Sequence, residues 1–396
     1  MPAVQLEFSS YIAPESVGSK TLTVIRTGST AGAFTVDYAT SDIAGANPCN
    51  VFNSGIASSR CDYETTLGTL KFAAGEASKT ISIPIIDDAY AEGNEGFTLT
   101  LSNAAGISLG SPSSATITIT DNESQNGPNP ISDARYFVRV HYLDFLNREP
   151  DMDGWNFWTG KTTPCGDPDP LVCRINVSAS FFLSIEFKET GYLVERTYKV
   201  AYGDADGMST KPVVHSLKVP SVRFNEFLSD TQQITKGVIV LQTGWEQQIE
   251  NNKVAFFADF VQRNRFTSAF PTTMTPTQFV DKLNTNAGNV LSASERTTAI
   301  NLFGGAGNTT NTNARAQALR QVAEDQDLVN AELPRAFVLM QYFGYLRRNP
   351  NDPQDSDYTG YDFWLTTLNQ FGGSYINAQM VKAFITSLEY NARFGP

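Results

Sequence analysis

The spacing of apolar residues changes once along this chain, and that change limits the class of fold that it can adopt. Between Val4 and Asp121, short segments of alternating apolar and polar residues are separated by turn-forming residues. Such alternation is typical of strands that bury one face and expose the other. Beyond Ala134, apolar residues recur at intervals of three and four, as in amphipathic helices. The sequence therefore predicts a multidomain chain, first β and then α.

The β region contains several segments that we predict as strands of an antiparallel, Greek-key-like β-sandwich. Each segment is short and ends at a turn signal, as such a sandwich requires. They cover residues 21–28, 33–42, 68–76, 79–88, 96–104 and 114–122. Residues 4–8 also alternate, and we expect them to pair within the same sandwich. Addition of this strand to a neighbouring molecule is the alternative.

The second region is predicted to be an all-α domain. Residues 135–148, 245–266, 314–325 and 331–348 have the apolar spacing of amphipathic helices. Residues 122–133 are polar and contain two prolines and a glycine, which is typical of a linker. A chain of 396 residues is also longer than one hydrophobic core usually supports. We predict a sandwich at 1–124, a linker at 125–133 and a helical domain at 134–396.

One acidic segment of the β region suggests a metal site. In residues 83–97, an apolar strand pattern is followed by Asp87 and Asp88, and then by Glu92 and Glu95. Carboxylates placed this closely repel one another unless a cation neutralises them, and Ca²⁺ prefers six to eight oxygen ligands. The segment therefore predicts a calcium site at one end of the sandwich. The alternative is a solvated acidic turn.

The first third of the chain resembles the Calx-beta domain, the calcium-sensing module of sodium–calcium exchangers. The resemblance is carried by YIAPESVGSKTLTVIRTG, YATSD, CDYETTLGTLKFAAGE, IIDDAYAEGNEGF and TITITDN. It implies bound Ca²⁺, with ligands at Glu15, Asp42, Asp87, Asp88, Glu92, Glu95 and Asp121. Tight-binding members end their last strand in three aspartates, whereas this chain has Asp121-Asn122-Glu123. The lost charge implies fewer ions or a weaker affinity.

Cysteine spacing and composition favour an exported protein. Cys49 and Cys61 form one close pair, and Cys165 and Cys173 form another. Neither pair has the spacing of a zinc site, so we expect two local disulfides and an oxidising compartment. Four reduced thiols are the alternative. The start of the chain resembles no signal peptide, so we expect a mature or excised form.

Net charge argues against a nucleic-acid partner, and hydropathy argues against a transmembrane span. The formal net charge is −12 and the pI is about 4.7, which argues against nucleic acid because phosphates require basic residues. No run of 18 apolar residues occurs, so we expect no transmembrane span. We predict an extracellular or bacterial cell-surface protein.

The helical region contains an internal repeat. YLDFLNREPDMDGWNFW matches YFGYLRRNPNDPQDSDYTGYDFW, and FFLSIEF matches FITSLEY, which places the copies near 135–192 and 335–394. Residues 133–396 resemble a bacterial helical domain of unknown function, number four-two-one-four, whose motif is similar to that of phycobilisome linker polypeptides. The resemblance implies no catalytic activity. In each repeat a proline ends one helix and a glycine–aromatic pair begins the next, which favours a structural role.

The aspartate-rich loops of the helical region could serve as helix caps or as metal ligands. The loops at Asp151 and at Asp204 are interpreted as caps, because Asx-turns use the same residues. The third loop, with Asp355, Asp357 and Asp362, is a candidate for a second metal site. It lacks the twelve-residue spacing and terminal glutamate of an EF-hand.

Nothing in the sequence indicates an enzyme. The two histidines, His141 and His215, lie in no catalytic motif, and no GxSxG, P-loop or HExxH sequence occurs. We expect a calcium-binding structural protein that self-associates into a filament or lattice, or that contacts other cell-surface components. The alternative is an adhesin or carbohydrate-binding module that acts as a monomer.

Overall fold

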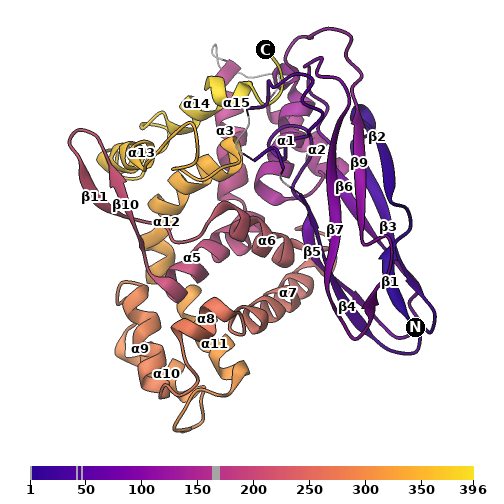
Figure 1. Ribbon diagram of the computed structural model, residues 1–396. Helices are drawn as coiled ribbons and strands as arrows, with labels where there is room; N and C mark the ends of the chain where they lie inside the picture. Colours follow the sequence, from indigo (N-terminus) through magenta and orange to yellow (C-terminus); the bar gives the residue numbers. More distant parts are fainter. Residues whose placement is uncertain (1, 42, 46–47, 163–169) are drawn as a thin grey trace. The chain divides into compact units, whose positions relative to one another are not determined.

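A computed structural model describes residues 2–41, 43–45, 48–162 and 170–396 (Figure 1). The chain divides into two compact units. One contains the strands of the N-terminal region together with helices from two other parts of the chain, and the other contains most of the helices. The first unit comprises Met1–Leu143, Asn147–Arg174 and Ala383–Pro396, and the second comprises Asp144–Leu146 and Ile175–Lys382.

The strands of the first unit form a β-sandwich, as predicted. One sheet has the order β6-β3-β1-β8 and the other has the order β2-β9-β7-β4-β5. The bounds are β1 Ala3–Leu6, β2 Ser10–Pro14, β3 Ser19–Thr27, β4 Phe34–Thr40, β5 Leu67–Phe72, β6 Ser78–Pro84, β7 Glu95–Ala105, β8 Ser108–Leu109 and β9 Ser114–Thr120. β1 pairs with both β3 and β8, so the first strand is paired within its own sandwich.

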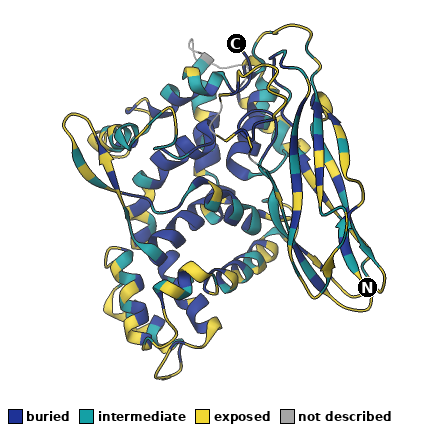
Figure 2. Ribbon diagram, in the orientation of Figure 1, coloured by how far each residue is buried: buried dark blue, intermediate teal, exposed yellow. Residues whose placement is uncertain are grey.

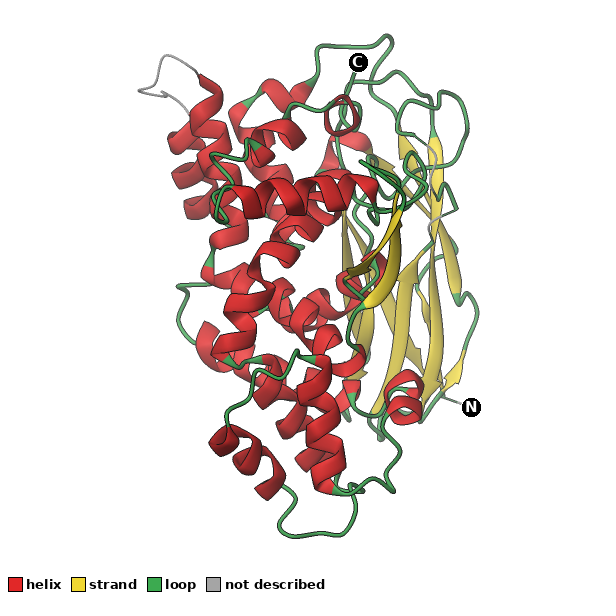
Figure 3. Ribbon diagram, turned by 90° about the vertical axis from the view of Figure 1, so that its left-hand side faces the viewer, coloured by secondary structure: helices red, strands yellow, loops and turns green. Residues whose placement is uncertain are grey.

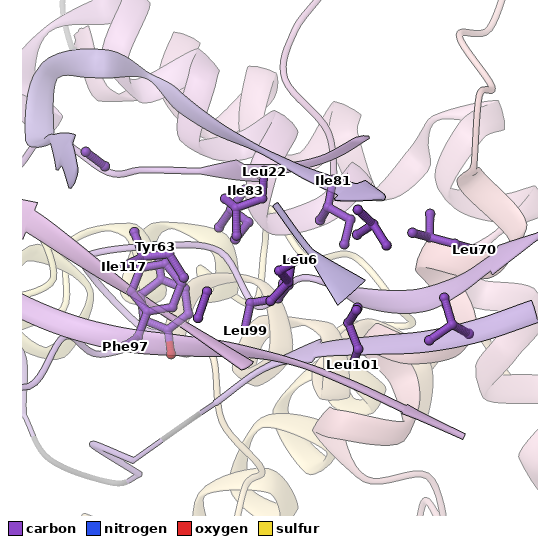
Figure 4. Packing of buried hydrophobic residues seen from close by; sticks show 14 of the residues in the cluster. Leu6, Leu22, Tyr63, Leu70, Ile81, Ile83, Phe97, Leu99, Leu101 and Ile117 are labelled. Atoms are coloured by element: carbon purple, nitrogen blue, oxygen red, sulfur yellow. The ribbon is translucent and has the colours of Figure 1, made fainter. Parts of the chain in front are cut away.

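The core of the sandwich lies between the two sheets. Leu22 and Ile83 come from one sheet and Leu99 from the other, and Figure 4 shows their side chains directed toward one another. Tyr63 stacks on Phe97 with the ring centroids 3.8 Å apart. Burial alternates along β7 and β9, which is the physical reason that their sequence alternates (Figure 2).

Helices also belong to the first unit. Arg139 of α1 donates through Nη2 to the backbone oxygens of Gly18 and Ile85, each at 2.9 Å, and so ties α1 to the sandwich. Asn129, in the predicted linker, donates through Nδ2 to the backbone oxygen of Asn391. The predicted limits 1–124, 125–133 and 134–396 stay a prediction. Among the helices that follow the sandwich, η2 Pro130–Ser132, α2 Met152–Thr162 and α15 Leu388–Asn391 lie wholly in this unit, whereas α1 Ala134–Leu146 and α14 Met380–Ile385 lie in it only in part.

Helices make up most of the second unit, together with a β-hairpin that apolar spacing did not predict. The hairpin joins β10 to β11, and Figure 3 colours such strands yellow and helices red. Burial alternates along both strands, but the buried positions of β10 are Gly207 and Ser209, so its sequence shows no apolar alternation. The bounds are α3 Pro170–Leu183, α4 Ile185–Glu189, α5 Gly191–Tyr202, β10 Ala205–Ser209, β11 His215–Val219, α6 Phe224–Thr235, α7 Trp245–Phe260, α8 Asn264–Ala269, α9 Pro276–Asn286, α10 Ala293–Asn301, α11 Thr312–Ala323, α12 Gln326–Met340, η3 Gln341–Leu346 and α13 Thr359–Gln370.

One predicted helix, 245–266, is interrupted in the structure. α7 ends at Phe260 and α8 begins at Asn264, because Arg263 adopts an extended conformation with φ −62° and ψ 143°. Its guanidinium donates to both carboxylate oxygens of Asp230 at 2.8 Å. Asp230 is 2% exposed and Arg263 is half-buried, so the helix is interrupted where Arg263 neutralises a buried carboxylate.

The first copy of the repeat ends α1 with a tight turn. Asn147 takes the left-handed conformation, with φ 54°, and the N–H of Arg148 donates to the backbone oxygen of Tyr142. The Arg148 guanidinium lies 4.9 Å from the Tyr142 ring centroid and 3.4 Å from Asp151 Oδ2. Gly154 packs under the Tyr142 hydroxyl, where a Cβ atom would collide.

The second copy builds the same turn from its own residues. Arg347 takes the left-handed conformation, with φ 53°, and the N–H of Arg348 donates to the backbone oxygen of Tyr342. The Arg348 guanidinium lies 5.5 Å from the Tyr342 ring centroid and 2.9 Å from Asp355 Oδ2. Gly360 packs under the Tyr342 hydroxyl as Gly154 does under Tyr142. Both copies therefore use their Arg, Tyr and Gly for structure.

Candidate metal centre

Loops at one end of the sandwich bring distant carboxylates together. β2 runs parallel to β9 with Pro14 opposite Thr120, and β7 runs antiparallel to β9 with Glu95 opposite Ile119. The end of β2, the end of β9 and the start of β7 therefore meet at one edge. Glu15 follows β2 directly in the short helix η1 (Glu15–Val17).

Within the described residues, one carboxylate group consists of Asp62, Asp88 and Glu92. Each offers one oxygen, and these oxygens lie within 4.8 Å of one another. The three residues are 4–9% exposed, so they are nearly removed from water. Ionised carboxylates that are buried this close together require a compensating positive charge.

A second carboxylate group in the described part of the chain consists of Glu15, Asp121 and Glu123. Its oxygens also lie within 4.8 Å of one another. Glu15 is buried, whereas Asp121 and Glu123 are half-buried. The two groups are adjacent, since Glu15, Asp62, Glu92, Glu95 and Asp121 line one small pocket.

Backbone amides hold several of these carboxylates in place. The N–H of Ser58 donates to Asp62 Oδ2 at 2.5 Å, and the N–H of Tyr90 donates to Asp88 Oδ1 at 2.7 Å. The N–H of Gly93 donates to Asp121 Oδ2 at 2.7 Å. One oxygen of each of these three carboxylates is therefore held by a backbone donor of its own or a neighbouring loop.

Several carboxylate oxygens nevertheless lack a hydrogen-bond partner among the described residues. The buried oxygens without such a partner include Asp87 Oδ1, Asp88 Oδ2 and Glu123 Oε2. An ionised carboxylate can only accept, and leaving a buried acceptor unsatisfied costs about 1–3 kcal/mol. A set composed entirely of carboxylate oxygens matches the preference of a hard cation such as Ca²⁺. The residues present therefore fit such an ion.

Without a metal ion, the electrostatics of the site favour the protonated forms of its carboxyl groups. Burial, together with a smaller contribution from neighbouring carboxylates, raises the pKa of Glu15 to about 8 and the pKa of Asp88 and Glu92 to about 9. Burial also raises the pKa of Asp62 well above its usual range, and the charge of Asp88 raises it as well. A cation in the pocket would favour the ionised forms instead.

The structure places most of the predicted ligands at this end and adds two that sequence reasoning missed. Glu15, Asp88, Glu92 and Asp121 belong to the two groups, Glu95 lines their pocket, and Asp87 directly precedes Asp88. Asp42 lies outside the described residues. The missed residues are Asp62 and Glu123. Asp62 follows Cys61 at a position with no strand pattern, and Glu123 stands where tight-binding members of the family have an aspartate.

The candidate second metal site is not assembled in the described part of the chain. Asp355 accepts from Arg348 Nη2 at 2.9 Å, and Asp357 accepts from the N–H of Thr359 at 2.8 Å. Asp362 accepts from Ser209 Oγ at 2.8 Å. No group of three metal-ligating side chains is formed by these aspartates within the described residues. Ion pairing and capping account for them.

A disulfide stabilises the loop before Asp62. Cys49 and Cys61 are bonded, with their Cα atoms 5.8 Å apart. The predicted pairing of Cys165 with Cys173 involves Cys165, which lies outside the described residues. In the described residues, none of the helices combines the length and the apolar character needed to cross a bilayer.

The fold and the carboxylate-lined end define the N-terminal region as a Calx-beta domain, and residues 1–123 match the family of that description. Sodium/calcium exchanger 1 of Canis lupus familiaris is 35% identical over 136 residues, covering 30% of this chain and 13% of the exchanger. Adhesion G-protein coupled receptor V1 of Danio rerio is 29% identical over 129 residues, covering 32% of this chain and 2% of the receptor.

Solved structures are similar to part of this chain. The crystal structure of the apo-form Calx CBD1 domain has 28% sequence identity and a TM-score of 0.27, covering 31% of this chain and 98% of that one. The crystal structure of the calcium binding domain CBD12 of CALX1.1 has 29% identity and a TM-score of 0.26, covering 30% of this chain and 45% of that one.

Proposed function

We propose that this chain is a calcium-binding structural protein whose sandwich is stabilised by ions held at its carboxylate-lined end. The observation that carries the proposal is the convergence of buried and half-buried carboxylates from four separate segments, with acceptor oxygens that lack a partner among the described residues. The Calx-beta match supports it, since relatives of this domain include a sodium/calcium exchanger.

The chain offers enough oxygen ligands for more than one ion. Asp62, Asp88 and Glu92 would hold one, and Glu15, Asp121 and Glu123 would hold another. Asp87 and Glu95 lie beside these groups and would complete the oxygen shell. The ion supplies positive charge that removes the mutual repulsion of the carboxylates.

We further propose that the protein is secreted or displayed on a bacterial cell surface and assembles with copies of itself. The Cys49–Cys61 disulfide supports an oxidising compartment. β2 is an edge strand of its sheet, and Ile12 on that strand is 65% exposed. An edge strand with an exposed apolar residue favours association with another chain. We propose a binding and structural role rather than a catalytic one. We also propose that residues 133–396 belong to the helical family that they resemble.

Calorimetric titration of the full chain with Ca²⁺, followed by electron microscopy, tests the proposal. We expect saturable binding and, with calcium present, filaments or a lattice. Glu92→Gln should weaken binding, whereas Glu7→Gln, which changes an exposed glutamate in the same way, should not. Absence of binding by the unmodified chain would contradict the calcium site. Calcium binding by a chain that stays monomeric and binds glycans would instead favour an adhesin.

A further inference from the structure

The last residues of the chain are hydrogen-bonded to the loops that carry one of the two carboxylate groups. The backbone oxygen of Phe394 accepts from the N–H of Ala89 at 3.0 Å, and Ala89 directly follows Asp88. Arg393 donates through Nε to the backbone oxygen of Arg60 at 2.8 Å, two residues before Asp62. Two consecutive C-terminal residues therefore connect the two backbone segments that supply Asp88 and Asp62.

These C-terminal residues are part of the packed interior of the first unit. Arg393 and Phe394 are both 0% exposed. The Arg393 guanidinium lies 4.7 Å from the ring centroid of Phe394, and that ring packs edge-on against Tyr136 of α1 at 5.7 Å. Burying an arginine is costly unless its hydrogen bonds are made, so the hydrogen bond to Arg60 stabilises the buried position of Arg393.

Further contacts fix the same segment to the same loops. Tyr90 donates through its hydroxyl to the backbone oxygen of Ala392 at 3.3 Å, and Arg60 forms an ion pair with Glu389 at 2.9 Å. Asn129 donates to the backbone oxygen of Gly395 at 3.0 Å. Residues 389–395 are thus held at several points around the carboxylate-bearing loops.

The positions of the ligands depend on the backbone that the C-terminal segment contacts. Asp62 is held by the N–H of Ser58 in the turn that contains Arg60, and Asp88 is held by the N–H of Tyr90, next to Ala89. A shift of Arg60 or Ala89 would therefore change the separation of the two carboxylates. Ion affinity depends on that separation, because the ligand oxygens must converge on one centre.

We propose that residues 389–395 form a C-terminal clasp that positions Asp62 and Asp88 for Ca²⁺, and that bound Ca²⁺ in turn tightens the clasp. The proposal rests on the proposed calcium site. Coupling between two binding events is reciprocal, so whatever the clasp adds to ion affinity the ion adds to the docking of the clasp. Arg393 acts here as a positioning residue, since it reaches Asp62 only through the backbone of Arg60.

Calcium titration of the full-length Arg393→Ala variant tests the clasp. We expect the dissociation constant for Ca²⁺ to rise by about 5- to 150-fold, the range usual for coupled sites. Arg315→Ala is the matched control, because Arg315 is also buried, at 2% exposure, but belongs to the second unit. The control should leave calcium affinity unchanged. A folded Arg393→Ala variant with unchanged affinity would overturn the clasp.

Hydrogen exchange of the unmodified full chain provides a second test that does not depend on the variant folding. Amides of residues 389–395 should exchange more slowly in Ca²⁺ than in chelator. Protection that is equal in both conditions, in a chain that binds Ca²⁺ by calorimetry, would overturn the clasp and leave the calcium site standing. Absence of calcium binding by the unmodified chain would overturn both.

Discussion

The backbone N–H of Asp88 donates a hydrogen bond to Glu15 Oε1 at 3.1 Å. This contact joins the two carboxylate groups, since Asp88 belongs to one and Glu15 to the other. It also spans 73 residues of sequence, so it links the loop after β6 to the short helix after β2. A change of charge in either group therefore acts directly on the other.

Calcium should stabilise the chain, and Glu92→Gln should remove much of that effect. Linkage predicts a gain of about 2.7 kcal/mol in unfolding free energy at a free calcium concentration about 100 times the dissociation constant. Thermal melting in Ca²⁺ and in chelator measures the gain. The Glu7→Gln control should retain the whole shift, because Glu7 is exposed and outside the carboxylate groups. Equal melting temperatures in the two buffers would contradict the prediction.

Without calcium, the chain should lose stability as pH rises. The folded-state pKa values of Glu15, Asp88 and Glu92 are raised to about 8, 9 and 9, mainly by burial. Unfolded carboxyls titrate near pH 4, so between about pH 4 and pH 9 the folded state binds more protons than the unfolded state. The unfolding free energy therefore falls across that window.

Melting in chelator at several pH values checks this sign. The melting temperature should decrease from about pH 5 to pH 8, while the increase caused by added Ca²⁺ should grow over the same interval, because only ionised carboxylates bind the ion. A calcium-free chain whose melting temperature rises over this interval would show that these carboxyls do not control the pH dependence.

Removing the Cys49–Cys61 disulfide should destabilise the sandwich. The bond closes a loop with a sequence separation of 12, for which the chain-entropy estimate is roughly 3 kcal/mol. Chemical denaturation of Cys49→Ser/Cys61→Ser in the presence of Ca²⁺ measures the loss. We also expect weaker calcium binding, since Asp62 directly follows Cys61. Unchanged stability of the variant would show that the loop is fixed by its other contacts alone.

Alanine at either repeat glycine should be destabilising. A Cβ atom at Gly154 would collide with the Tyr142 hydroxyl, and one at Gly360 would collide with the Tyr342 hydroxyl. Overpacking of this kind costs about 1–3 kcal/mol. Gly160→Ala in the same helix α2 is the control, because a Cβ atom there meets nothing within 4 Å and alanine favours a helix. If Gly154→Ala is as stable as Gly160→Ala, the repeat does not depend on this contact.

Self-association should depend on the exposed edge strand β2. Ile12→Lys places a charge on that edge, which natural sheets use to prevent pairing with other chains. Sedimentation velocity in Ca²⁺ should then show a smaller assembly than for the unmodified chain. Ile12→Val keeps an apolar β-branched side chain at the edge and should assemble normally. A chain that is monomeric at high concentration without any substitution would remove the basis of this prediction.

The sequence by itself determined the order of the fold and named most residues of the candidate site. Alternation along β7 and β9 and helical spacing along α1 are local patterns, because each reports which face of one element is buried. The acids Asp88 and Glu92 could be recognised because they cluster in sequence. The repeat was visible for the same reason, since each copy carries its own Tyr, Arg and Gly.

Only the tertiary structure decided which distant residues meet. Asp62 joins Asp88 and Glu92, and Arg393 reaches Arg60 across 333 residues, through chain reversals that no local pattern encodes. The break at Arg263 has the same origin, because a buried Asp230 elsewhere in the chain outweighs helix propensity there. Sequence patterns record which side of an element is buried, whereas long-range packing and burial decide which charges become neighbours.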